Sequence, residues 1–373
     1  MNSLLKKYSD YWFAPVVLIL LNRTLLFFVA FASLKFLPLE SNFPWRFFPD
    51  NLFLDGWARW DSGWYLDIAE TGYYFSSGKE CNIAFYPFYP ILTYITNFFT
   101  PYTALSGILV ANICFFLSCL VFYKLVEEKF NKNLAFEALA CFIFYPLSLF
   151  FSAAYSESTF VLLCLLCFYN ARRNNWLIAS LWALCASATR LPGLLLFPTL
   201  VLHYLENLGF SFKKIRKDFF FILIAPLGSI FYALFLWIKF GDPLLYYNIQ
   251  RDVWHVRYIN LPGLINFTRN AFTKTWEYPW LFCVIFSIIF LIALIKLIKK
   301  IEYAYLFFGA GLYIISIASV SQSMGRYFAV IFPVFIGIPF LIRNRLLKIV
   351  FYVANTVLLI LLTIKFSLWG HII

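Results

Sequence analysis

The sequence predicts an all-α, polytopic integral membrane protein whose 373 residues form one domain. Hydrophobic residues make up 62% of the chain and charged residues only 13%, a balance that no water-soluble fold of this size tolerates on its surface. Apolar stretches of about 15 to 23 residues recur from end to end, as expected for transmembrane helices. Short clusters of basic residues separate these stretches, as in the cytoplasmic loops of membrane proteins.

These stretches predict about eleven transmembrane helices. The long apolar run 175–206 is divided in two, because Arg190 interrupts it just before Leu191-Pro192-Gly193 and two short spans fit the charges where one tilted span does not. The first stretch lacks a clear small-residue cleavage site, so it is expected to remain as an anchor. In chain order, the predicted spans are 14–37, 103–123, 134–151, 157–171, 175–190, 191–206, 219–240, 280–299, 303–321, 327–342 and 347–367.

Six basic clusters set the predicted orientation of the chain. They contain 17 of the 30 lysines and arginines. If all six lie on the cytoplasmic side, the spans alternate without conflict, with the N-terminus in the cytoplasm and the C-terminus outside. The net charge of +12 is therefore assigned to loops that face an anionic membrane surface, and no nucleic acid is expected as a partner.

Residues 83–100 are apolar but are not assigned as a span. They contain Pro87, Pro90 and several aromatic residues, and a span here would move every later basic cluster to the outside. The segment is therefore interpreted as a re-entrant or interfacial element, since broken backbone is tolerated where it lines a cavity.

Under this topology, five unusual polar segments emerge on the same outer face, although charge rules alone do not require it. The loop 38–82 carries seven of the 18 acidic residues against three basic ones. Polar groups are costly near a bilayer, so their gathering predicts an extracytoplasmic site. The five segments are residues 38–82, 151–158, 188–193, the loop 241–279, and 319–327.

Residues 57–70 combine acidic and aromatic side chains and are expected to form an amphipathic helix at the membrane surface. Asp61 is the single charge on the aromatic face of this helix, where low-dielectric surroundings can tune a carboxylate to act as a base. The alternative is an interfacial anchor helix in which Asp61 pairs with an arginine. The expected aromatic face comprises Trp57, Trp60, Asp61, Trp64, Tyr65 and Ile68, while Arg59, Ser62, Asp67 and Glu70 are expected to point toward water.

Other polar residues on the outer face have two interpretations each. Glu157 begins a span, where it either orients a substrate or simply favours the helix N-terminus. Arg190 and Arg326 lie at the outer membrane edge against the positive-inside trend, so each requires an anionic partner, either a carboxylate or a lipid phosphate. The loop 241–279 adds a group that suits sugar binding or a solvated loop: Gln250, Arg251, Trp254, His255 and Arg257.

The chain contains no P-loop, dinucleotide fingerprint, metal-ligand cluster or nucleophile elbow. A nucleotide-sugar enzyme needs a soluble nucleotide-binding domain, and none fits between these spans. An activated substrate is therefore expected to arrive within the membrane itself. No cofactor is expected; Asp61 with Glu157 offers two ligands for a divalent cation, but nothing in the sequence requires one.

A series of motifs runs along most of the chain. It comprises Arg59-Trp60-Asp61, Tyr65-Leu66, Ile68-Ala69-Glu70, Gly72-Tyr73, Ala84-Phe-Tyr-Pro-Phe-Tyr-Pro90, Phe151-Ser-Ala-Ala-Tyr-Ser-Glu-Ser158, Ser187-Ala-Thr-Arg-Leu-Pro-Gly193, Phe240-Gly-Asp-Pro243 and Ser323-Met-Gly-Arg-Tyr327. In these residues and their order, the sequence resembles the PIG-V type of GPI mannosyltransferase and its bacterial relatives, within the GT-C glycosyltransferases.

The resemblance implies an inverting transferase that moves a hexose, expected to be mannose, from a polyprenyl-phosphate sugar to an acceptor hydroxyl on the extracytoplasmic face. It places the catalytic base at Asp61 and the lipid phosphate at Arg190 or Arg326. Glu70 and Glu157 are then expected to orient sugar or acceptor hydroxyls. The other residues expected to bind substrate are Arg59, Trp60, Gln250, Trp254 and Tyr327.

The resemblance also bears on location and on the role of Asp67. Asp67 lies where the family is permissive, so it is not expected to be catalytic. The chain is shorter than eukaryotic members of the family, which favours a bacterial relative in the inner (cytoplasmic) membrane over an enzyme that acts on GPI.

Two other classes of function stay open. A lipid-linked sugar flippase or transporter predicts charges near mid-span and internal repeats. No convincing repeat is found, and the charges concentrate at the outer edge. An envelope glycan ligase or polymerase would share an outer site with a transferase. The acceptor, a lipid or a glycan, is not identified by any motif.

Overall fold

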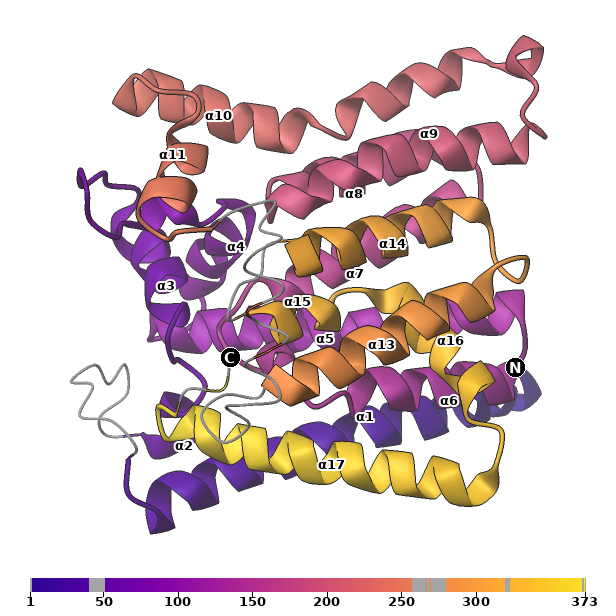
Figure 1. Cartoon of the computed structure of the whole chain (residues 1–373), viewed down its shortest axis with the longest axis horizontal. Helices are drawn as coiled ribbons and strands as arrows, with labels where there is room; N and C mark the ends of the chain where they lie inside the picture. The colour runs from indigo at the N-terminus through magenta and orange to yellow at the C-terminus, as the bar shows by residue number, and fades with distance from the viewer. Residues whose placement is uncertain are drawn as a thin grey trace.

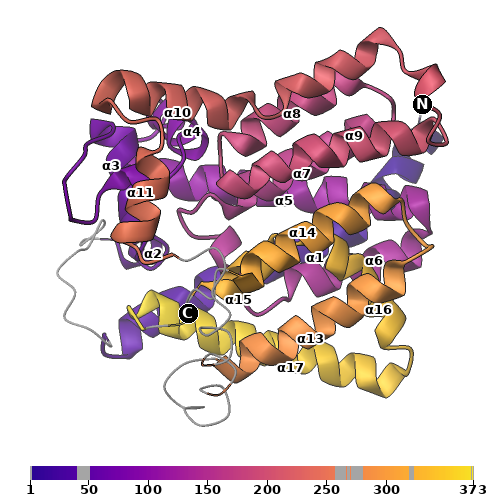
Figure 2. The same ribbon diagram turned by 45° about the horizontal axis from the view of Figure 1, so that its top comes forward.

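A computed structural model of the chain describes residues 2–39, 51–256, 266, 269, 280–318, 323–370 and 372. Within these residues every regular element is a helix. Most helices run along a common axis, and four short ones gather at the end of the bundle opposite the N-terminus: α2 (Leu52–Asp55), α3 (Ser62–Thr71), α4 (Phe88–Asn97) and α11 (Leu245–Asp252) (Figure 1). A view turned by 45° shows the same arrangement (Figure 2). The predicted all-α class is confirmed.

The remaining elements follow the predicted spans. The helices are α1 (Asn2–Phe36), α5 (Thr103–Lys129), α6 (Lys132–Ile143), α7 (Glu157–Ala171), α8 (Trp176–Ser187), α9 (Leu196–Asn207), α10 (Leu227–Phe240), α13 (Trp280–Leu297), α14 (Tyr303–Ala318), α15 (Met324–Ala329), α16 (Phe332–Leu341) and α17 (Arg345–Ser367). Short 3₁₀ segments are η1 (Asn82–Ala84), η2 (Ser148–Phe151), η3 (Leu191–Leu195), η4 (Phe212–Lys214) and η5 (Lys217–Ile224).

Three of the described helices are long and apolar enough to cross a membrane: Trp12–Phe36 of α1, α5 and α17. The pair η5 and α10, bent by 42° at its junction, makes a fourth if it forms one span. Other apolar helices among the described residues, including α7, α8, α14 and α16, have only 10–17 residues. Each predicted span corresponds to one helix or to a broken pair, and the count of eleven spans stays a prediction.

The connection between α6 and α7 lies deep in the bundle. α6 and α7 contain 12 and 15 residues, about 18 and 22 Å, less than the ~30 Å of a hydrocarbon core. Asn112 of α5 donates a hydrogen bond from Nδ2 to the carbonyl oxygen of Ser152 at 2.9 Å. Asn112 is about 14 Å below the start of α5 at Thr103. The segment 152–157 therefore lies well below the end of the longer helix.

Two glycines allow helices to pack backbone against backbone, as is common in membrane bundles. A Cβ atom at Gly228 would lie 2.1 Å from the carbonyl oxygen of Leu184, so glycine allows α10 to pack on α8. A Cβ atom at Gly337 would lie 2.4 Å from the carbonyl oxygen of Ala293, between α16 and α13. These contacts join α10 to α8 and α16 to α13.

The segment 83–100 contains the ten-residue helix α4, which is about 15 Å long. Tyr89 on its buried face donates a hydrogen bond to the carbonyl oxygen of Gly107 in α5 at 2.9 Å. Its other face exposes Ile91, Tyr94 and Ile95. A helix of this length does not cross a bilayer by itself, and its assignment as a re-entrant or interfacial element stays a prediction.

Candidate active site

Four charged side chains from distant parts of the sequence meet in one row, here called the charge row: Asp61, Arg326, Glu157 and Arg190. Oδ2 of Asp61 lies 2.6 Å from Nη1 of Arg326. Nε of Arg326 lies 3.3 Å from Oε1 of Glu157, and the same oxygen lies 2.6 Å from Nη1 of Arg190. The signs alternate along the row and its formal charges cancel. The fold thus brings together candidates from four of the predicted outer segments.

The charge row is largely removed from water. The side chain of Glu157 is fully buried, and those of Arg326, Arg190 and Asp61 are 10%, 14% and 24% exposed. Burying four charges is costly even when they are paired, so such a group is a candidate functional site. Asp61, at the most exposed end, is the carboxylate that a substrate reaches most easily.

The backbone around Asp61 differs from the prediction. A single helix over residues 57–70 is wrong, because α3 begins only at Ser62 and Asp61 occupies the N-cap position without a side-chain capping bond. Trp60 has a left-handed φ of 50°, which interrupts any helix before Asp61. The Asp61 carboxylate is therefore available to Arg326 instead of sharing a helical face with Trp57.

Arg59 and Ser62 were expected to point toward water, and both are buried. Nη2 of Arg59 lies 2.6 Å from Oδ2 of Asp55, and its Nε donates a hydrogen bond to the carbonyl oxygen of Ser367 at 3.1 Å. Its guanidinium also lies 4.6 Å from the ring centre of Trp369. Arg59 therefore joins the turn before α3 to the end of α17, and its predicted contact with substrate stays a prediction.

A neighbouring tyrosine fixes the position of the turn. The N–H of Asp61 donates a hydrogen bond to Oη of Tyr155 at 3.2 Å, and the hydroxyl of Tyr155 donates to the carbonyl oxygen of Arg59 at 3.1 Å. Trp60, predicted to bind substrate, is half-buried and packs edge-on against Trp369 with ring centres 5.5 Å apart. The backbone that carries Asp61 is thereby tied to the segment that carries Glu157.

Glu157 is the first residue of α7, where the helix dipole favours a carboxylate. Among the described residues, its buried Oε2 has no hydrogen-bond partner. The preceding Ser156 accepts a hydrogen bond from Nη1 of Arg190 at 3.3 Å, and its Oγ lies 2.7 Å from Oη of Tyr65. Burial raises the pKa of Tyr65, so this side chain stays a neutral hydroxyl.

Aromatic rings surround the two guanidiniums. Arg326 lies 5.2 Å from the ring centre of Tyr155 and 5.5 Å from those of Phe150 and Tyr327. Arg190 also lies 5.5 Å from the ring centre of Tyr327, which is half-buried. Such contacts stabilise cations out of water, and they place the predicted substrate residue Tyr327 against both arginines.

The loop that carries Arg190 depends on a glycine. A Cβ atom at Gly193 would lie 2.5 Å from the backbone carbonyl of Ala186. Glycine therefore lets η3 fold back on the end of α8, with Arg190 in the extended residue between them. This gives a physical reason for the Leu191-Pro192-Gly193 sequence that follows Arg190.

Three aromatic side chains form a cluster beside α3, here called the aromatic cluster: Trp64, Phe85 and Trp254. The ring centres of Trp64 and Phe85 lie 6.1 Å apart in a stacked arrangement, and Trp254 meets each of them edge-on at 6.0 and 5.8 Å. Gln250 donates a hydrogen bond to the carbonyl oxygen of Ala84 at 3.0 Å, which anchors α11 here. Trp254 thus contacts Trp64, which lies about one helical turn along the chain from Asp61.

Glu70 does not join the charge row, because it lies exposed near the end of α3. Asp67 accepts a hydrogen bond from Nδ2 of Asn82 at 2.8 Å, which holds η1 against α3. Arg257 and the rest of the loop 257–279, apart from two isolated positions, lie outside the described residues, as do residues 40–50 and 319–322.

A divalent cation does not suit Asp61 and Glu157 in this arrangement. Both carboxylates already face Arg326, whose positive charge opposes a second cation. Among the described residues, no group of three or more histidine, cysteine or carboxylate side chains has the proximity that metal binding requires.

The structure also shows a polar residue that the sequence analysis missed. Arg23 lies in the middle of the first predicted span and donates a hydrogen bond from Nη1 to Oγ of Ser152 at 2.5 Å. A cation inside an apolar stretch is itself a signal of function, and the first span could have been marked on that ground.

The sequence of the chain matches a known protein family. The family described as Mannosyltransferase (PIG-V) matches residues 16–296, three quarters of the chain. The chain belongs to this family. The resemblance found in the motifs is thereby confirmed.

Curated members of the family named GPI mannosyltransferase 2 are similar to the chain. The relative from Schizosaccharomyces pombe is 25% identical over 261 residues, which cover 62% of this chain and 54% of the relative. The relative from Drosophila pseudoobscura pseudoobscura is 34% identical over 134 residues, covering 32% and 28% respectively. The chain thus spans about half or less of the length of these relatives.

A solved structure shows the same fold. The crystal structure of ArnT from Cupriavidus metallidurans bound to undecaprenyl phosphate aligns with a TM-score of 0.51 at 11% identity, covering 90% of this chain and 62% of ArnT. The predicted GT-C-type membrane fold is confirmed.

Proposed function

We propose that this protein transfers a hexose, mannose by family membership, from a polyprenyl-phosphate sugar to an acceptor hydroxyl, with Asp61 as the general base. The observation that carries the proposal is the charge row: a partly exposed carboxylate beside two guanidiniums, about 14 Å below the end of α5. A site at this depth suits substrates that the bilayer delivers. The reaction needs no metal ion, since the guanidiniums supply the positive charge.

Arg326 and Arg190 are assigned to the phosphate of the lipid carrier. Guanidiniums form paired hydrogen bonds with phosphate oxygens, and both side chains are positioned by Glu157. Undecaprenyl phosphate is bound in the ArnT structure, which has the same fold. Membership of the mannosyltransferase family favours mannose as the sugar.

The reaction is an inverting displacement at the anomeric carbon. The acceptor oxygen forms a bond to this carbon while its proton passes to Asp61, and the bond from the carbon to the phosphate oxygen breaks on the opposite face. The leaving phosphate keeps the bonding electrons, so its negative charge grows. Arg326 and Arg190 stabilise that charge in the transition state more than in the bound substrate.

The acceptor is assigned to the side of Asp61 that faces the aromatic cluster. Aromatic rings with nearby polar groups offer apolar faces and hydrogen bonds to a sugar ring, and the buried Nε1 of Trp254 has no partner among the described residues. Gln250 borders this region through its hydrogen bond to the residue before Phe85. Either a glycolipid or a glycan can present the hydroxyl.

The orientation follows from the basic clusters. We assign the protein to the bacterial cytoplasmic membrane, with its N-terminus in the cytoplasm and the charge row toward the extracytoplasmic side. The inner-end basic groups Lys129, Arg172 and Lys348 support this assignment, because they lie at helix ends opposite Glu157.

A transfer assay tests the proposal. Purified full-length protein is given labelled polyprenyl-phosphate mannose and a membrane-lipid extract, and the labelled product is measured. Wild type should transfer, and Asp61→Asn should lower the rate by about 10²- to 10⁴-fold. Asp67→Asn, the same change one turn and a half along α3, should remain within about threefold. Unchanged transfer by Asp61→Asn would remove this residue from the mechanism.

A further inference from the structure

Arg23 is a cation in the middle of an apolar helix. In α1, the window from Trp12 to Phe36 has the length and hydropathy of a membrane span, and Arg23 lies about 16 Å from its start and about 20 Å from its end. A charged side chain at this depth is expensive and is normally paired with an opposite charge. Its position alone therefore calls for an anion.

No carboxylate of the described residues lies within ion-pair distance of Arg23. Instead its Nε and Nη2 donate hydrogen bonds to Oδ1 of Asn22 at 3.0 and 2.6 Å, and its Nη1 donates to Ser152. The guanidinium lies 4.3 Å from the ring centre of Phe115. Arg59, by contrast, is buried against Asp55.

A buried polar group without a partner adjoins this cation. Asn22 is 1% exposed, and its Nδ2 has no hydrogen-bond partner among the described residues. A buried donor without an acceptor costs about 1–3 kcal/mol, so an acceptor-rich ligand would relieve it. A cation and a spare N–H donor on adjacent residues match an oxyanion such as phosphate.

Arg23 is half-buried and borders the lipid-facing surface. Leu20, one turn before Arg23 on α1, is exposed, as are Leu21 and Phe28 farther around this helix and Ile113 and Leu117 on α5. α1 and α5 meet at Arg23 through Phe115. The apolar chain of a lipid whose phosphate binds at Arg23 can therefore extend sideways into the bilayer.

The depth of Arg23 selects one kind of lipid. A phospholipid keeps its phosphate at the membrane surface, about 16–20 Å away. A polyprenyl carrier must bring its phosphate to the deep layer that holds the charge row, and Arg23 lies in this layer because both Arg23 and Asn112 bond Ser152. Phe150, two residues before Ser152, contacts Arg326.

We propose that Arg23 and Asn22 bind the phosphate of a polyprenyl carrier at the contact between α1 and α5, as a station between the bilayer and the charge row. This inference rests on the proposed function. It assigns a second phosphate position, next to Ser152 where Arg190 lies next to Ser156, and a lateral route for the carrier.

Photocrosslinking tests the station without requiring transfer. Full-length protein in lipid nanodiscs is incubated with undecaprenyl phosphate that carries a photoreactive group near its phosphate, and the adducts are mapped. Wild type should give adducts at 20–28 of α1 and 109–117 of α5. Arg23→Gln should lower their yield by about tenfold or more, since a hydrogen bond to a charged group is lost. Arg23→Lys keeps the cation and should retain most of the yield.

Two control variants distinguish phosphate binding by Arg23 from a purely structural role of its hydrogen bond to Ser152. Ser152→Ala removes the bond to Arg23 but leaves the cation, so adduct yield should stay within about threefold. Thr24→Val, on the exposed neighbouring position, should have no effect. If Ser152→Ala reduces the adducts as much as Arg23→Gln, or if neither does, the station is refuted.

Competition identifies the source of the phosphate. Unlabelled undecaprenyl phosphate should suppress the adducts, whereas phosphatidylglycerol and inorganic phosphate at equal concentration should not. Equal suppression by phosphatidylglycerol would reassign Arg23 to a structural phospholipid and overturn the carrier assignment, and suppression by inorganic phosphate would overturn the lateral route.

The transfer assay distinguishes the two proposals. If wild type transfers mannose but gives no adducts at α1 and α5, the phosphate site at Arg23 is refuted and the proposed function is not. If wild type gives these adducts but transfers no sugar, the proposed function is refuted, and the result supports a protein that binds the carrier without transferring its sugar. With both intact, Arg23→Gln should raise KM for the lipid donor about tenfold and change kcat by less than about threefold.

Discussion

The two ends of α7 use the same kinds of charged residue in different surroundings. Glu157 at its first residue is fully buried and shared by two arginines. At the opposite end of the bundle, here called the inner end after its predicted orientation, Glu302 lies 2.8 Å from Lys129, and Glu128 lies 2.7 Å from Arg173, with these side chains 22–33% exposed. The inner pairs can exchange with water, as Asp61 can, whereas Glu157 cannot. Burial, and not residue type, therefore marks the candidate site.

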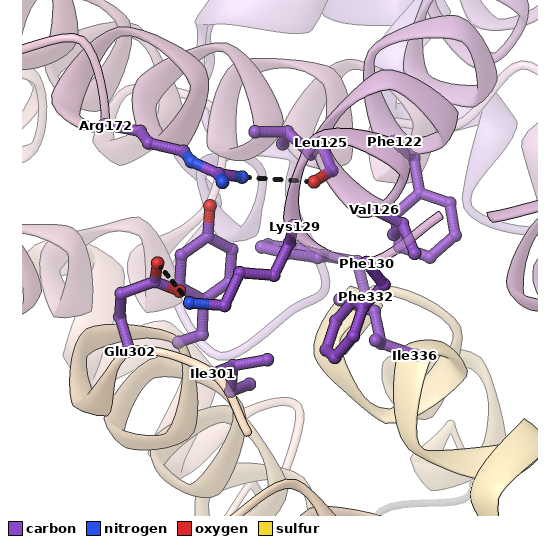
Figure 3. A pocket seen from close by; sticks show the side chains of 11 residues that line it. Phe122, Leu125, Val126, Lys129, Phe130, Arg172, Ile301, Glu302, Phe332 and Ile336 are labelled. Atoms are coloured by element: carbon purple, nitrogen blue, oxygen red, sulfur yellow. Dashed lines mark hydrogen bonds and ion pairs between the residues drawn. The ribbon is translucent and has the colours of Figure 1, made fainter. Parts of the chain in front are cut away.

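The inner end also contains a small cavity, shown in Figure 3. Its volume of about 10 Å³ suffices for a single water molecule. Lys129 and Glu302 meet at its edge, and Arg172 donates a hydrogen bond to the carbonyl oxygen of Leu125 at 3.2 Å. The cavity is a gap between helix ends and is too small for a sugar.

The largest expected effect is on stability at the charge row. Glu157→Ala leaves Arg190 and Arg326 buried without their shared carboxylate, so the free energy of unfolding should fall by about 3–5 kcal/mol. Glu302→Ala at the inner end should cost about 1 kcal/mol or less. Denaturation of the purified variants in the same detergent measures both. Equal losses at the two ends would contradict the comparison.

The next largest effect is on the transfer rate, and it compares an arginine of the charge row with an arginine of the inner end. Arg326→Gln removes a guanidinium from the developing phosphate charge, so kcat should fall by about 10²- to 10³-fold. Arg173→Gln, which breaks an exposed pair with Glu128 and local contacts with Tyr169, should leave kcat within about twofold. Rates at saturating lipid donor provide the measurement, and a normal kcat for Arg326→Gln would show that this residue only supports the fold.

A smaller effect is expected at the aromatic cluster. Trp254→Ala removes one of three rings that contact one another, and KM for the acceptor should rise up to about tenfold while KM for the donor stays unchanged. Trp237→Ala, on an exposed position of α10, provides a matched control. A change in donor KM instead would move the aromatic cluster to the donor side.

The smallest effect is the pH dependence of the inner pair. Burial by itself would raise the pKa of Glu302, but the hydrogen bond and charge of Lys129 lower it below its ordinary 4.5. A carboxyl group with a lowered folded-state pKa stabilises the fold above 4.5, and this contribution is lost as the pH falls through the folded pKa. Wild type should therefore exceed Glu302→Gln in stability at pH 7, and the difference should shrink as the pH falls below 4.5. A difference that persists in acid would exclude ionisation as its cause.

Much of the fold could be predicted from local pattern. The apolar stretches became helices, and the division of 175–206 at Arg190 matches the break between α8 and η3. The prediction that Arg190 and Arg326 have anionic partners is confirmed. Arg190 pairs with Glu157, and Arg326 pairs with Asp61 and Glu157. The helix that periodicity predicts over residues 57–70 is wrong before Ser62. Trp57 is buried in the core there, and Trp60 has a left-handed φ. A tertiary contact there overrides the local preference.

The sequence by itself determined that the chain is a helical membrane protein with carboxylates and arginines in its loops, because hydrophobic length and charge position are local properties. Only the tertiary structure decided which of them meet. It placed Asp61 beside Arg326, gave Glu157 to two arginines, buried Arg59 against Asp55, and left Arg23 without a carboxylate among the described residues. These partners lie up to 265 positions apart, and only the packing of helices brings such distant residues together.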